Sequence, residues 1–391
     1  MVHLSRAMRE IAPYPFEELD RRAAAARAQG RELVDLGVGD PRDATPAFIR
    51  QALAEAVQPV SSYPRAAGLP ELRAAVGAWV ARRYGVELDP DRHVLPILGS
   101  KELVFSLAQL VVDPAAEREV VVVTAPGYPI PERGARWAGA EVVRLPLLGE
   151  RGFLPDLHAV PEATWTRTAL LWLNYPNNPT GATAPPELYA DAAALARHYG
   201  FLLASDEAYG ELWFEGGPPG SALQQPDFAH VVALHTLSKR SSMTGYRSGF
   251  VAGDPDVIAA LKRLRPAVGV TPQEFVQRAS IAAWEDETHV AEARARYAAK
   301  RSLFLELFSR TGIQVGGSAG TFYLWVRTPG NRPSLDWALD LLDTCDVVVA
   351  PGSFFGPEGE GYVRMAMVPS LQDCRVAARR IGDVLAAGAI A

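Results

Sequence analysis

Cysteine is scarce in this sequence, since only Cys345 and Cys374 occur among 391 residues. So few cysteines argue against a disulfide framework and fit a reducing compartment such as the cytoplasm. The seven histidines are scattered, and none forms a metal-type cluster with a nearby cysteine or histidine. We therefore expect neither disulfide bonds nor a bound metal.

Long apolar runs are also missing. No run approaches the ~20 residues needed to span a bilayer, and the start, "MVHLSRAMREIAPYPFEELDRR", lacks the apolar core of a signal peptide. The net charge is −6 with Lys and Arg spread along the chain, which argues against a nucleic-acid or anionic-membrane partner. The spacing of a Walker phosphate loop is absent as well. These absences predict a soluble, cytoplasmic protein and leave small anionic ligands possible.

What is present is a globular composition, with 48% apolar and 21% charged residues. A chain of this length is expected to form one large domain and a smaller one. Helical segments such as "PELYADAAALARHYG" and "DPDVIAALKRLR" alternate with short apolar runs that read as buried strands. These runs are "EVVVVTAP", "TALLWLNYP", "FLLASDEAY", "HVVALHTLSK" and "GFVAGDP". The alternation predicts an α/β fold, in which helices cover both faces of a mostly parallel central sheet as a three-layer sandwich.

The pattern changes at about residue 286. One long helical segment comes first, and the short strands "GTFYLWV", "DVVVAPGSFFG" and "GYVRMAMV" follow it. The last segment, "SLQDCRVAARRIGDVLAAG", has the spacing of an amphipathic helix. We therefore predict a small α+β domain at 286–391, a large domain at 41–285, and an N-terminal arm at 1–40 that forms part of the small domain.

Several predicted strands end in polar side chains. In an open α/β sheet, ligands bind outside the carboxyl ends of the strands, so these side chains should meet in one crevice. Asp206, after "FLLAS", is either a cap or turn residue or a half-buried carboxylate that needs a cationic partner, such as a protonated pyridine nitrogen. Tyr209 is placed to offer a hydroxyl to the same ligand. Asn178, in "LNYPNNPTG", is either an ordinary turn residue or an amide fixed toward a ligand.

A second group of residues suits an anion. The sequence "LPILGSKELVF" runs from a strand into a helix, and the unpaired N–H groups at a helix start attract anions. Ser100 and Lys101 lie at this start, where simple capping by Ser100 is the alternative. The residues placed to complete a phosphate site are Thr236, Ser238 and Arg247, the arginine through a bidentate contact.

Two further residues lie at strand ends. Tyr128, in the proline-rich turn "TAPGYPIP", either packs against the protein or stacks on a ring-bearing ligand. Lys239 follows the apolar run "HVVALHTL". Most lysines are solvated, but a desolvated lysine near other cations has a lowered pKa and becomes the nucleophile that Schiff-base chemistry requires. The crevice therefore suits a ligand with an aldehyde, a ring cation and a phosphate.

The strings around these residues resemble the fold-type I aminotransferases that use pyridoxal 5′-phosphate. The resemblance covers essentially the whole chain in the order of the family. The matching strings are "LGVGDP", "YPRAAGLPELR", "GSKE", "PGY", "NYPNNPTG", "SDEAYGEL", "LSKRSSMTGYRSGF", "GTFYLW" and "APGSFFGPEGEGYVR". The resemblance implies the aminotransferase fold, pyridoxal 5′-phosphate as cofactor, and transamination between amino acids and oxo acids in two half-reactions.

The resemblance also implies roles for residues that would contact the cofactor ring. Lys239 corresponds to the catalytic lysine that binds the cofactor covalently and carries the proton. Asp206 corresponds to the partner of the ring nitrogen. Tyr128 would stack on the ring, while Asn178 and Tyr209 would hydrogen-bond its hydroxyl group.

Further matches imply how the phosphate and the substrate are held. Arg364, in "GYVRMA", corresponds to the arginine that binds the substrate α-carboxylate, with Asn178 and the backbone of Gly39 beside it. Tyr63, in "SSYPRAAG", resembles a tyrosine that reaches the phosphate of the neighbouring subunit, which implies a homodimer with shared sites. The residues that would hold the phosphate within one subunit are Ser100, Lys101, Thr236, Ser238 and Arg247.

Three strings, "PYPFEEL", "LPILGSKE" and "LSKRS…GYRSGF", most resemble N-succinyldiaminopimelate aminotransferases. Those enzymes use glutamate to aminate N-succinyl-2-amino-6-oxopimelate in lysine and cell-wall synthesis. Ser242 departs from that subgroup, in which asparagine is expected. The distal carboxylates of such a substrate need cations, and Arg65 and Arg240 are candidates by position unless they are solvated surface charges. A broader aspartate-, alanine- or glutamate-type aminotransferase and a carbon–sulfur lyase remain alternatives.

Overall fold

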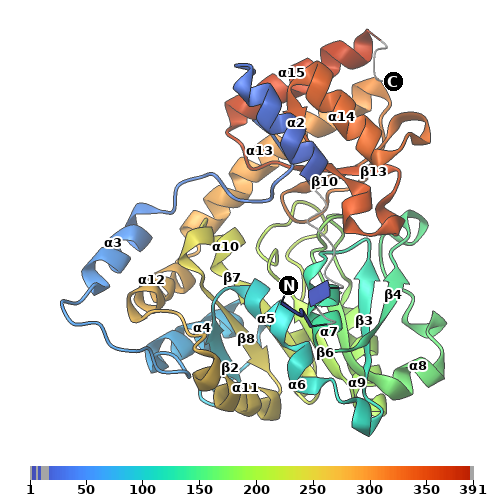
Figure 1. Cartoon of the computed structure of the whole chain (residues 1–391). Helices are drawn as coiled ribbons and strands as arrows, with labels where there is room; N and C mark the ends of the chain where they lie inside the picture. Colours follow the sequence, from blue (N-terminus) through green and yellow to red (C-terminus); the bar gives the residue numbers. More distant parts are fainter. Residues whose placement is uncertain (1, 6–7, 10–16, 388–391) are drawn as a thin grey trace.

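A seven-stranded sheet forms the centre of the large domain in this computed structural model, which describes residues 2–5, 8–9 and 17–387 (Figure 1). Its strands are β2 (Val94–Ile97), β3 (Val120–Ala125), β4 (Glu141–Pro146), β5 (Thr168–Asn174), β6 (Leu202–Asp206), β7 (Val231–Thr236) and β8 (Gly249–Gly253). They lie in the order β2-β8-β7-β6-β5-β3-β4. The pairs from β7 to β4 are parallel, while β8 is antiparallel to β2 and β7. The predicted mostly parallel sheet is confirmed.

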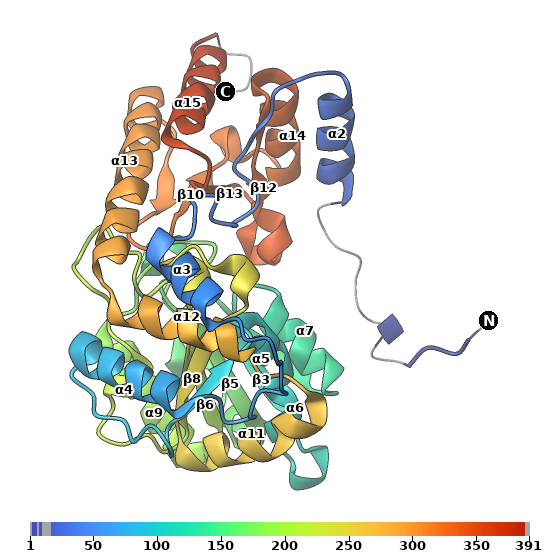
Figure 2. The same ribbon diagram turned by 90° about the vertical axis from the view of Figure 1, so that its left-hand side faces the viewer.

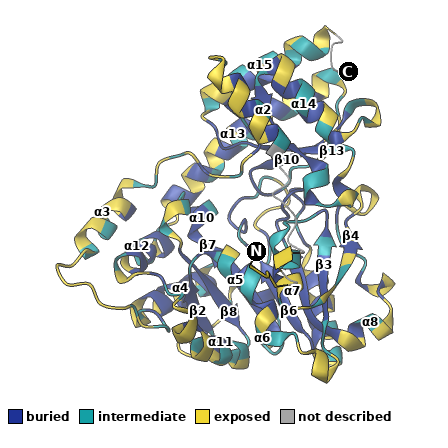
Figure 3. Ribbon diagram, viewed as in Figure 1, coloured by how far each residue is buried: buried dark blue, intermediate teal, exposed yellow. Residues whose placement is uncertain are grey.

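Helices cover both faces of this sheet, because successive strand residues point to opposite sides. Val121 and Val123 pack in a cluster with one set of helices, and Val120 and Val122 pack in another. The first face carries α5 (Ser100–Ser106), α6 (Ala108–Val111), α7 (Ile130–Trp137) and α11 (Pro255–Val268). The second face carries α4 (Pro70–Tyr84), α8 (Glu162–Arg167), α9 (Pro186–Tyr199) and α12 (Glu274–Glu285). Figure 2 shows the helices around the sheet, and the strands between them are mostly buried (Figure 3).

Local sequence explains where these helices begin and end. Pro186 starts α9, where its missing N–H costs no hydrogen bond. Gly200 ends it with φ of 74°, a left-handed conformation that glycine adopts without a Cβ clash. The helix predicted from "PELYADAAALARHYG" is therefore confirmed with its boundaries.

The small domain has its own sheet. Antiparallel strands lie in the order β12-β13-β10-β9, and β1 pairs in parallel with β11. These strands are β1 (Val34–Asp35), β9 (Val315–Gly317), β10 (Tyr323–Arg327), β11 (Val347–Val348), β12 (Ala350–Pro351) and β13 (Tyr362–Ala366). The helices beside them are α2 (Glu17–Ala28), α13 (Thr288–Thr311), α14 (Ser334–Cys345) and α15 (Leu371–Ala386). The α-helices α3 (Ala47–Ala56) and α10 (Leu237–Arg240) lie in the large domain near α12 (Figure 1).

The N-terminal segment is built into the small domain. Val34 and Leu36 pack in the same apolar cluster as Phe304 and Trp337, and Leu19 of α2 packs with Leu342 of α14. We therefore propose domain boundaries near residues 40 and 286. Residues 13–16, the first part of "PYPFEEL", lie outside the described residues.

The described residues include neither a membrane-spanning helix nor a metal-binding group of side chains. Within 2–5, 8–9 and 17–387, no helix combines the length and apolar character needed to cross a bilayer. The same residues contain no group of three His, Cys, Asp or Glu side chains arranged to hold a metal ion.

Candidate functional site

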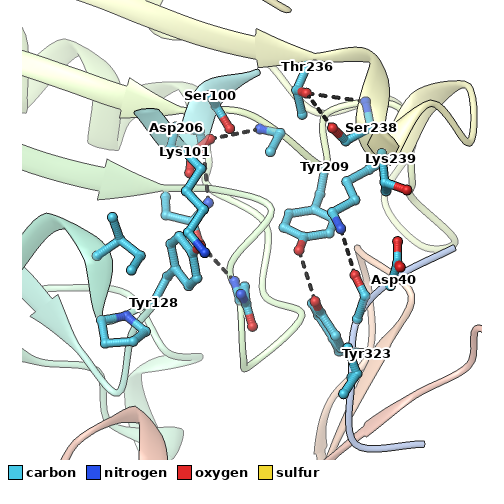
Figure 4. A pocket seen from close by; sticks show the side chains of 18 of the residues that line it. Asp40, Ser100, Lys101, Tyr128, Asp206, Tyr209, Thr236, Ser238, Lys239 and Tyr323 are labelled. Atoms are coloured by element: carbon cyan, nitrogen blue, oxygen red, sulfur yellow. Dashed lines mark hydrogen bonds between the residues drawn. The ribbon is translucent and has the colours of Figure 1, made fainter. Parts of the chain in front are cut away.

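A cavity of about 510 Å³ lies at the carboxyl edge of the central sheet, with the small domain on its other side. In Figure 4, Lys239, Asp40 and Tyr323 lie on one side of this cavity and Tyr128 lies on the opposite side. All the predicted site residues except Tyr63 line it. They are Gly39, Ser100, Lys101, Tyr128, Asn178, Asp206, Tyr209, Thr236, Ser238, Lys239, Arg247 and Arg364.

Lys239 reaches the cavity from α10, a single helical turn that follows β7. Thr236 starts this turn, since its side chain accepts a hydrogen bond from the N–H of Ser238 at 3.2 Å. Lys239 Nζ donates to the carbonyl oxygen of Gly39 at 2.6 Å. Burial lowers the pKa of Lys239 from its usual 10.5 to about 8, more than the nearby Asp40 carboxylate raises it. A neutral amine is therefore readily available here.

Asp206 is the last residue of β6 and is 6% exposed. One carboxylate oxygen accepts the N–H of Ala208 at 3.2 Å, so Asp206 also forms the turn that its sequence position suggests. Burial raises the pKa of Asp206 to about 7, because the charged form loses hydration. Among the described residues, no cationic side chain forms an ion pair with this carboxylate. A cationic ligand group would therefore stabilise it.

The residues expected to bind an anion come together at the start of α5. Ser100 is the first residue of this helix and does not cap it, because Gly99 occupies the cap position without a side-chain bond. Gly99 has φ of 71°, and a Cβ there would meet Arg247 Nη2 at 2.8 Å. Arg247 donates to the carbonyl oxygens of Thr244 and Leu98 at 2.8 and 3.1 Å. These bonds hold the guanidinium beside the free N–H groups of the helix start.

Arg364 connects the two domains across the cavity. Its Nη1 donates to Asn178 Oδ1 at 2.8 Å and its Nη2 to the carbonyl oxygen of Gly37 at 2.7 Å. The guanidinium carbon lies 4.2 Å from the ring centre of Tyr323 and 4.6 Å from that of Phe355. The Nε atom is buried without a hydrogen-bond partner in the described structure. This planar, held cation matches the geometry of a carboxylate.

Tyr209 lines the cavity between Asp206 and the small domain. Its hydroxyl lies 2.9 Å from that of Tyr323, and burial raises the pKa of Tyr209 well above 10. Gly39 packs against Tyr323, since a Cβ at this position would collide with Tyr323 Oη. The close approach of Gly39 therefore requires glycine.

Tyr63 differs from the other predicted site residues. It is fully exposed, at 101% of the reference surface, and does not line the cavity of its own chain. Its predicted contact is with a neighbouring subunit, so this position leaves the prediction untested.

The lining residues missed by the sequence interpretation include Asp40, Arg133, Asn174, Tyr323 and Phe355. Asn174 ends β5 and could have been found from its place at a strand end. Asp40 and Tyr323 stand inside the matching strings "LGVGDP" and "GTFYLW". Arg133 lies on helix α7, and nothing in the sequence around it indicated a place in the cavity.

The two arginines suggested for distal carboxylates do not line the cavity. Arg65 is exposed outside it. Arg240 is 2% exposed, so the alternative interpretation as a solvated charge is wrong. Its guanidinium donates to the carbonyl oxygen of Ala283 at 2.5 Å and to Glu287 at 2.6 Å, which fixes α10 against α12.

Comparison with known protein families identifies the scaffold. Residues 31–381 match the model of the family described as aminotransferase class I and II. The chain belongs to this family. It is thus an aminotransferase of the pyridoxal phosphate-dependent group, and the predicted fold, enzyme class and cofactor are confirmed.

Known aminotransferases resemble this one over nearly their full length. "LL-diaminopimelate aminotransferase 2" of Nostoc sp. is 35% identical over 98% of each chain. The structure of BacF from Bacillus subtilis, without ligand, has a TM-score of 0.92 and 32% identity over 98% of each chain. A Thermus thermophilus structure described as "probable N-succinyldiaminopimelate aminotransferase" has a TM-score of 0.87 and 33% identity, covering 94% of this aminotransferase and 99% of that chain.

The cavity fits the cofactor of the family. The protonated ring nitrogen of the cofactor would pair with the buried carboxylate of Asp206, which has no ion-pair partner among the described residues. The desolvated amine of Lys239 suits a covalent bond to the aldehyde of the cofactor. The helix start at Ser100 and the guanidinium of Arg247 together suit a phosphate. These three fits rest on groups from β6, α10, the start of α5 and the segment before β8, which the sheet brings to one edge.

Proposed function

We propose that this aminotransferase moves an amino group between glutamate and an oxo acid of the diaminopimelate class, as part of lysine biosynthesis in the cytoplasm. The observation that carries the proposal is the charge of the cavity. Its lining has five cationic side chains, Lys101, Arg133, Lys239, Arg247 and Arg364, against the two carboxylates of Asp40 and Asp206. A phosphate and a substrate with two carboxylates would balance this charge.

Several cavity residues are proposed to contact the cofactor. Asp206 holds the ring nitrogen in its protonated form, Tyr128 stacks on the ring, and Asn178 and Tyr209 hydrogen-bond its hydroxyl. Bound in this way, pyridoxal 5′-phosphate withdraws electrons from the substrate α-carbon and weakens the bond to its proton. The residues proposed to bind the phosphate are Ser100, Lys101, Thr236, Ser238 and Arg247.

The proton transfer is proposed to belong to Lys239. Because burial lowers the pKa of Lys239 to about 8, its free Nζ is neutral in a large fraction of molecules near pH 8. As a neutral amine, Nζ would accept the α-proton of the substrate and later give it up again, so it would act first as general base and then as general acid. Arg364 holds the α-carboxylate as a fork, with Gly39 closing over it, so that the α-proton points at Nζ.

Two acceptors are consistent with the diaminopimelate class. The Nostoc relative is named for LL-diaminopimelate, whose deamination leaves 2-amino-6-oxopimelate with a free distal amine. The Thermus structure is named for the N-succinyl form of the same compound. We propose the succinylated oxo acid as acceptor, and rates with the two oxo acids and glutamate test this choice. Equal or faster turnover of the free amine would reject the succinylated substrate.

Acceptor-free turnover separates transamination from a lyase reaction. An aminotransferase stops after one conversion of its cofactor when no oxo acid is present. Continued release of ammonia or a sulfur-containing leaving group would contradict the proposed function. Pyruvate and oxaloacetate as acceptors test the broader alternative, because equal rates with them would reject diaminopimelate specificity.

The Lys239→Ala variant tests the covalent role directly. We expect the wild-type protein to show the visible absorption band of a lysine-bound cofactor, and glutamate to convert it. Lys239→Ala should lack that band. The matched control is Lys262→Ala, which removes a partly exposed lysine of α11. Identical spectra for wild type and Lys239→Ala would reject the assignment.

A homodimer with shared sites is also proposed. Tyr63 is fully exposed in the single chain, and Val60, Val38 and Val268 are exposed apolar residues at 79%, 51% and 58%. Burial of these side chains against a second copy is favourable. Mixing Tyr63→Ala with Lys239→Ala chains tests the arrangement, because each mixed dimer regains one site with both native residues. A monomer in sedimentation equilibrium would exclude it.

The two cysteines support the proposed location. Cys345 and Cys374 are buried free thiols rather than a disulfide. Free thiols persist in a reducing compartment such as the cytoplasm.

A further inference from the structure

Arg133 lies on α7, where the main cavity meets a second cavity of about 210 Å³. It lines both, together with Tyr128, Pro129, Phe354 and Phe355. We propose that Arg133 binds the distal carboxylate of the substrate and so selects dicarboxylic amino acids and oxo acids. This inference rests on the proposed function and assigns one end of its substrate.

The other cations of the main cavity have tasks or partners. Arg364 bonds to Asn178 and Gly37, and Arg247 bonds to Thr244 and Leu98. Lys239 donates to the carbonyl oxygen of Gly39. Lys101 has no side-chain bond in the described structure, but it stands beside Ser100 at the helix start that suits the phosphate. One further cation, Arg133, therefore remains for the substrate.

Arg133 has no ion pair or side-chain hydrogen bond to any described residue, although its side chain is only partly exposed. A partly desolvated guanidinium without an anion is costly, and a ligand carboxylate would offset that cost. The neighbouring arginines cannot do this, because Glu132 holds both. Its carboxylate accepts from Arg136 at 2.9 Å and from Arg144 at 2.7 Å.

The position of Phe355 gives the substrate a path between the two cations. Its ring lies 4.6 Å from the Arg364 guanidinium, and it also lines the second cavity with Arg133. A substrate whose α-carboxylate is bound by Arg364 can extend its apolar chain along this ring and place its distal carboxylate at Arg133. The second cavity leaves room for a substrate longer than glutamate.

The test compares ligands that differ in the distal carboxylate alone. The holoenzyme is titrated with glutarate and with pentanoate, which do not react, and the shift of its visible band gives each dissociation constant. We expect Arg133→Gln to weaken glutarate by about tenfold or more relative to pentanoate, the loss of one charge-assisted contact. Arg133→Lys should restore part of the difference. An unchanged glutarate-to-pentanoate ratio would overturn the proposal.

A kinetic comparison uses glutamate and 2-aminopentanoate, which have the same chain length. The ratio of their kcat/KM values should fall by about tenfold in Arg133→Gln. Arg136→Gln is the matched control on the same helix, because its guanidinium is already held by Glu132, and it should keep the wild-type ratio. An equal fall in Arg136→Gln would indicate a general charge effect and overturn the proposal.

Arg65→Gln tests the rival arginine. A fall of the ratio in Arg65→Gln and not in Arg133→Gln would overturn the assignment in favour of Arg65. Wild-type holoenzyme that converts with neither amino acid would contradict the proposed function. The glutarate titration would still decide the role of Arg133 in that case.

Discussion

Arg364 of the small domain donates a hydrogen bond to Asn178 Oδ1 of the large domain at 2.8 Å. The residue proposed to bind the substrate is thus positioned by the residue proposed to bind the ring hydroxyl. Asn178 is itself fixed, since its N–H donates to Asn174 Oδ1 at 2.9 Å at the end of β5. The residues proposed for the substrate and for the cofactor are therefore held in one hydrogen-bonded frame.

Replacement of Arg364 should damage substrate binding without loss of the cofactor. We expect Arg364→Lys to lower kcat/KM for glutamate by roughly 100-fold, because a lysine cannot form the planar fork. The visible band of the bound cofactor should remain. Arg327→Lys, an exposed arginine of neighbouring strand β10, is the control and should be close to wild type. Loss of the cofactor band in Arg364→Lys would point to a structural role instead.

Asp206 should make the cofactor-free protein less stable as pH rises. Its pKa is about 7 in the fold against 3.8 for the free side chain, so ionisation is penalised in the folded state. The free energy of unfolding should fall between about pH 4 and 7, by roughly 3–4 kcal/mol from this group alone. Asp206→Asn should remove that slope in urea unfolding followed at several pH values.

The control for this experiment is Asp191→Asn, on the exposed side of α9. It should retain the wild-type slope. Added pyridoxal 5′-phosphate should reduce the slope in the wild-type protein, because the ring cation pairs with Asp206. Equal slopes in wild type and Asp206→Asn would show that the carboxyl does not ionise abnormally.

Lys239 should titrate near pH 8 in the cofactor-free protein. The chain has four lysines, Lys101, Lys239, Lys262 and Lys300, so ¹³C-methylated lysine resonances can be resolved by NMR. Because burial lowers the pKa of Lys239, the penalty for its charged form is full below about pH 8 and disappears as pH rises toward 10.5. The resonance that Lys239→Ala removes identifies it. A midpoint near 10.5 would contradict the burial.

Gly39→Ala should close the substrate side of the cavity. The new Cβ would collide with Tyr323 Oη, so either the segment or the tyrosine must move. We expect kcat/KM for glutamate to fall by about 10- to 100-fold, measured with saturating cofactor. A second change, Tyr323→Ala, should restore part of the loss. Gly245→Ala is the control, because a Cβ there meets no atom within 4 Å.

Ser242→Asn should stabilise the protein slightly. Ser242 has φ of 51°, a region in which asparagine is favoured over serine. We expect a gain of a few tenths to about 1 kcal/mol in the free energy of unfolding, measured by urea denaturation. Ser242→Val should be destabilising, since a β-branched side chain tolerates this conformation poorly. A stability loss in Ser242→Asn would show that packing outweighs the backbone preference.

The sequence by itself determined the sheet and the side chains at its edge. Asp206 ends β6, Asn178 follows β5 and Lys239 follows β7, so a parallel sheet brings them to one side whatever the details of packing. The same reasoning identified the helix start at Ser100. Local pattern was sufficient here because the carboxyl ends of parallel strands coincide.

Only the tertiary structure decided which other residues join them. Tyr323 and Arg364 enter from the small domain, and their approach depends on how that domain packs. Arg240 shows the limit most clearly, since it adjoins Lys239 in sequence yet points into the contact with α12. Neighbouring residues of a helical turn face about 100° apart, so nearness in sequence did not predict nearness in the cavity. Arg133, in contrast, carried no signal in the sequence, and it lines the cavity because the fold places α7 there.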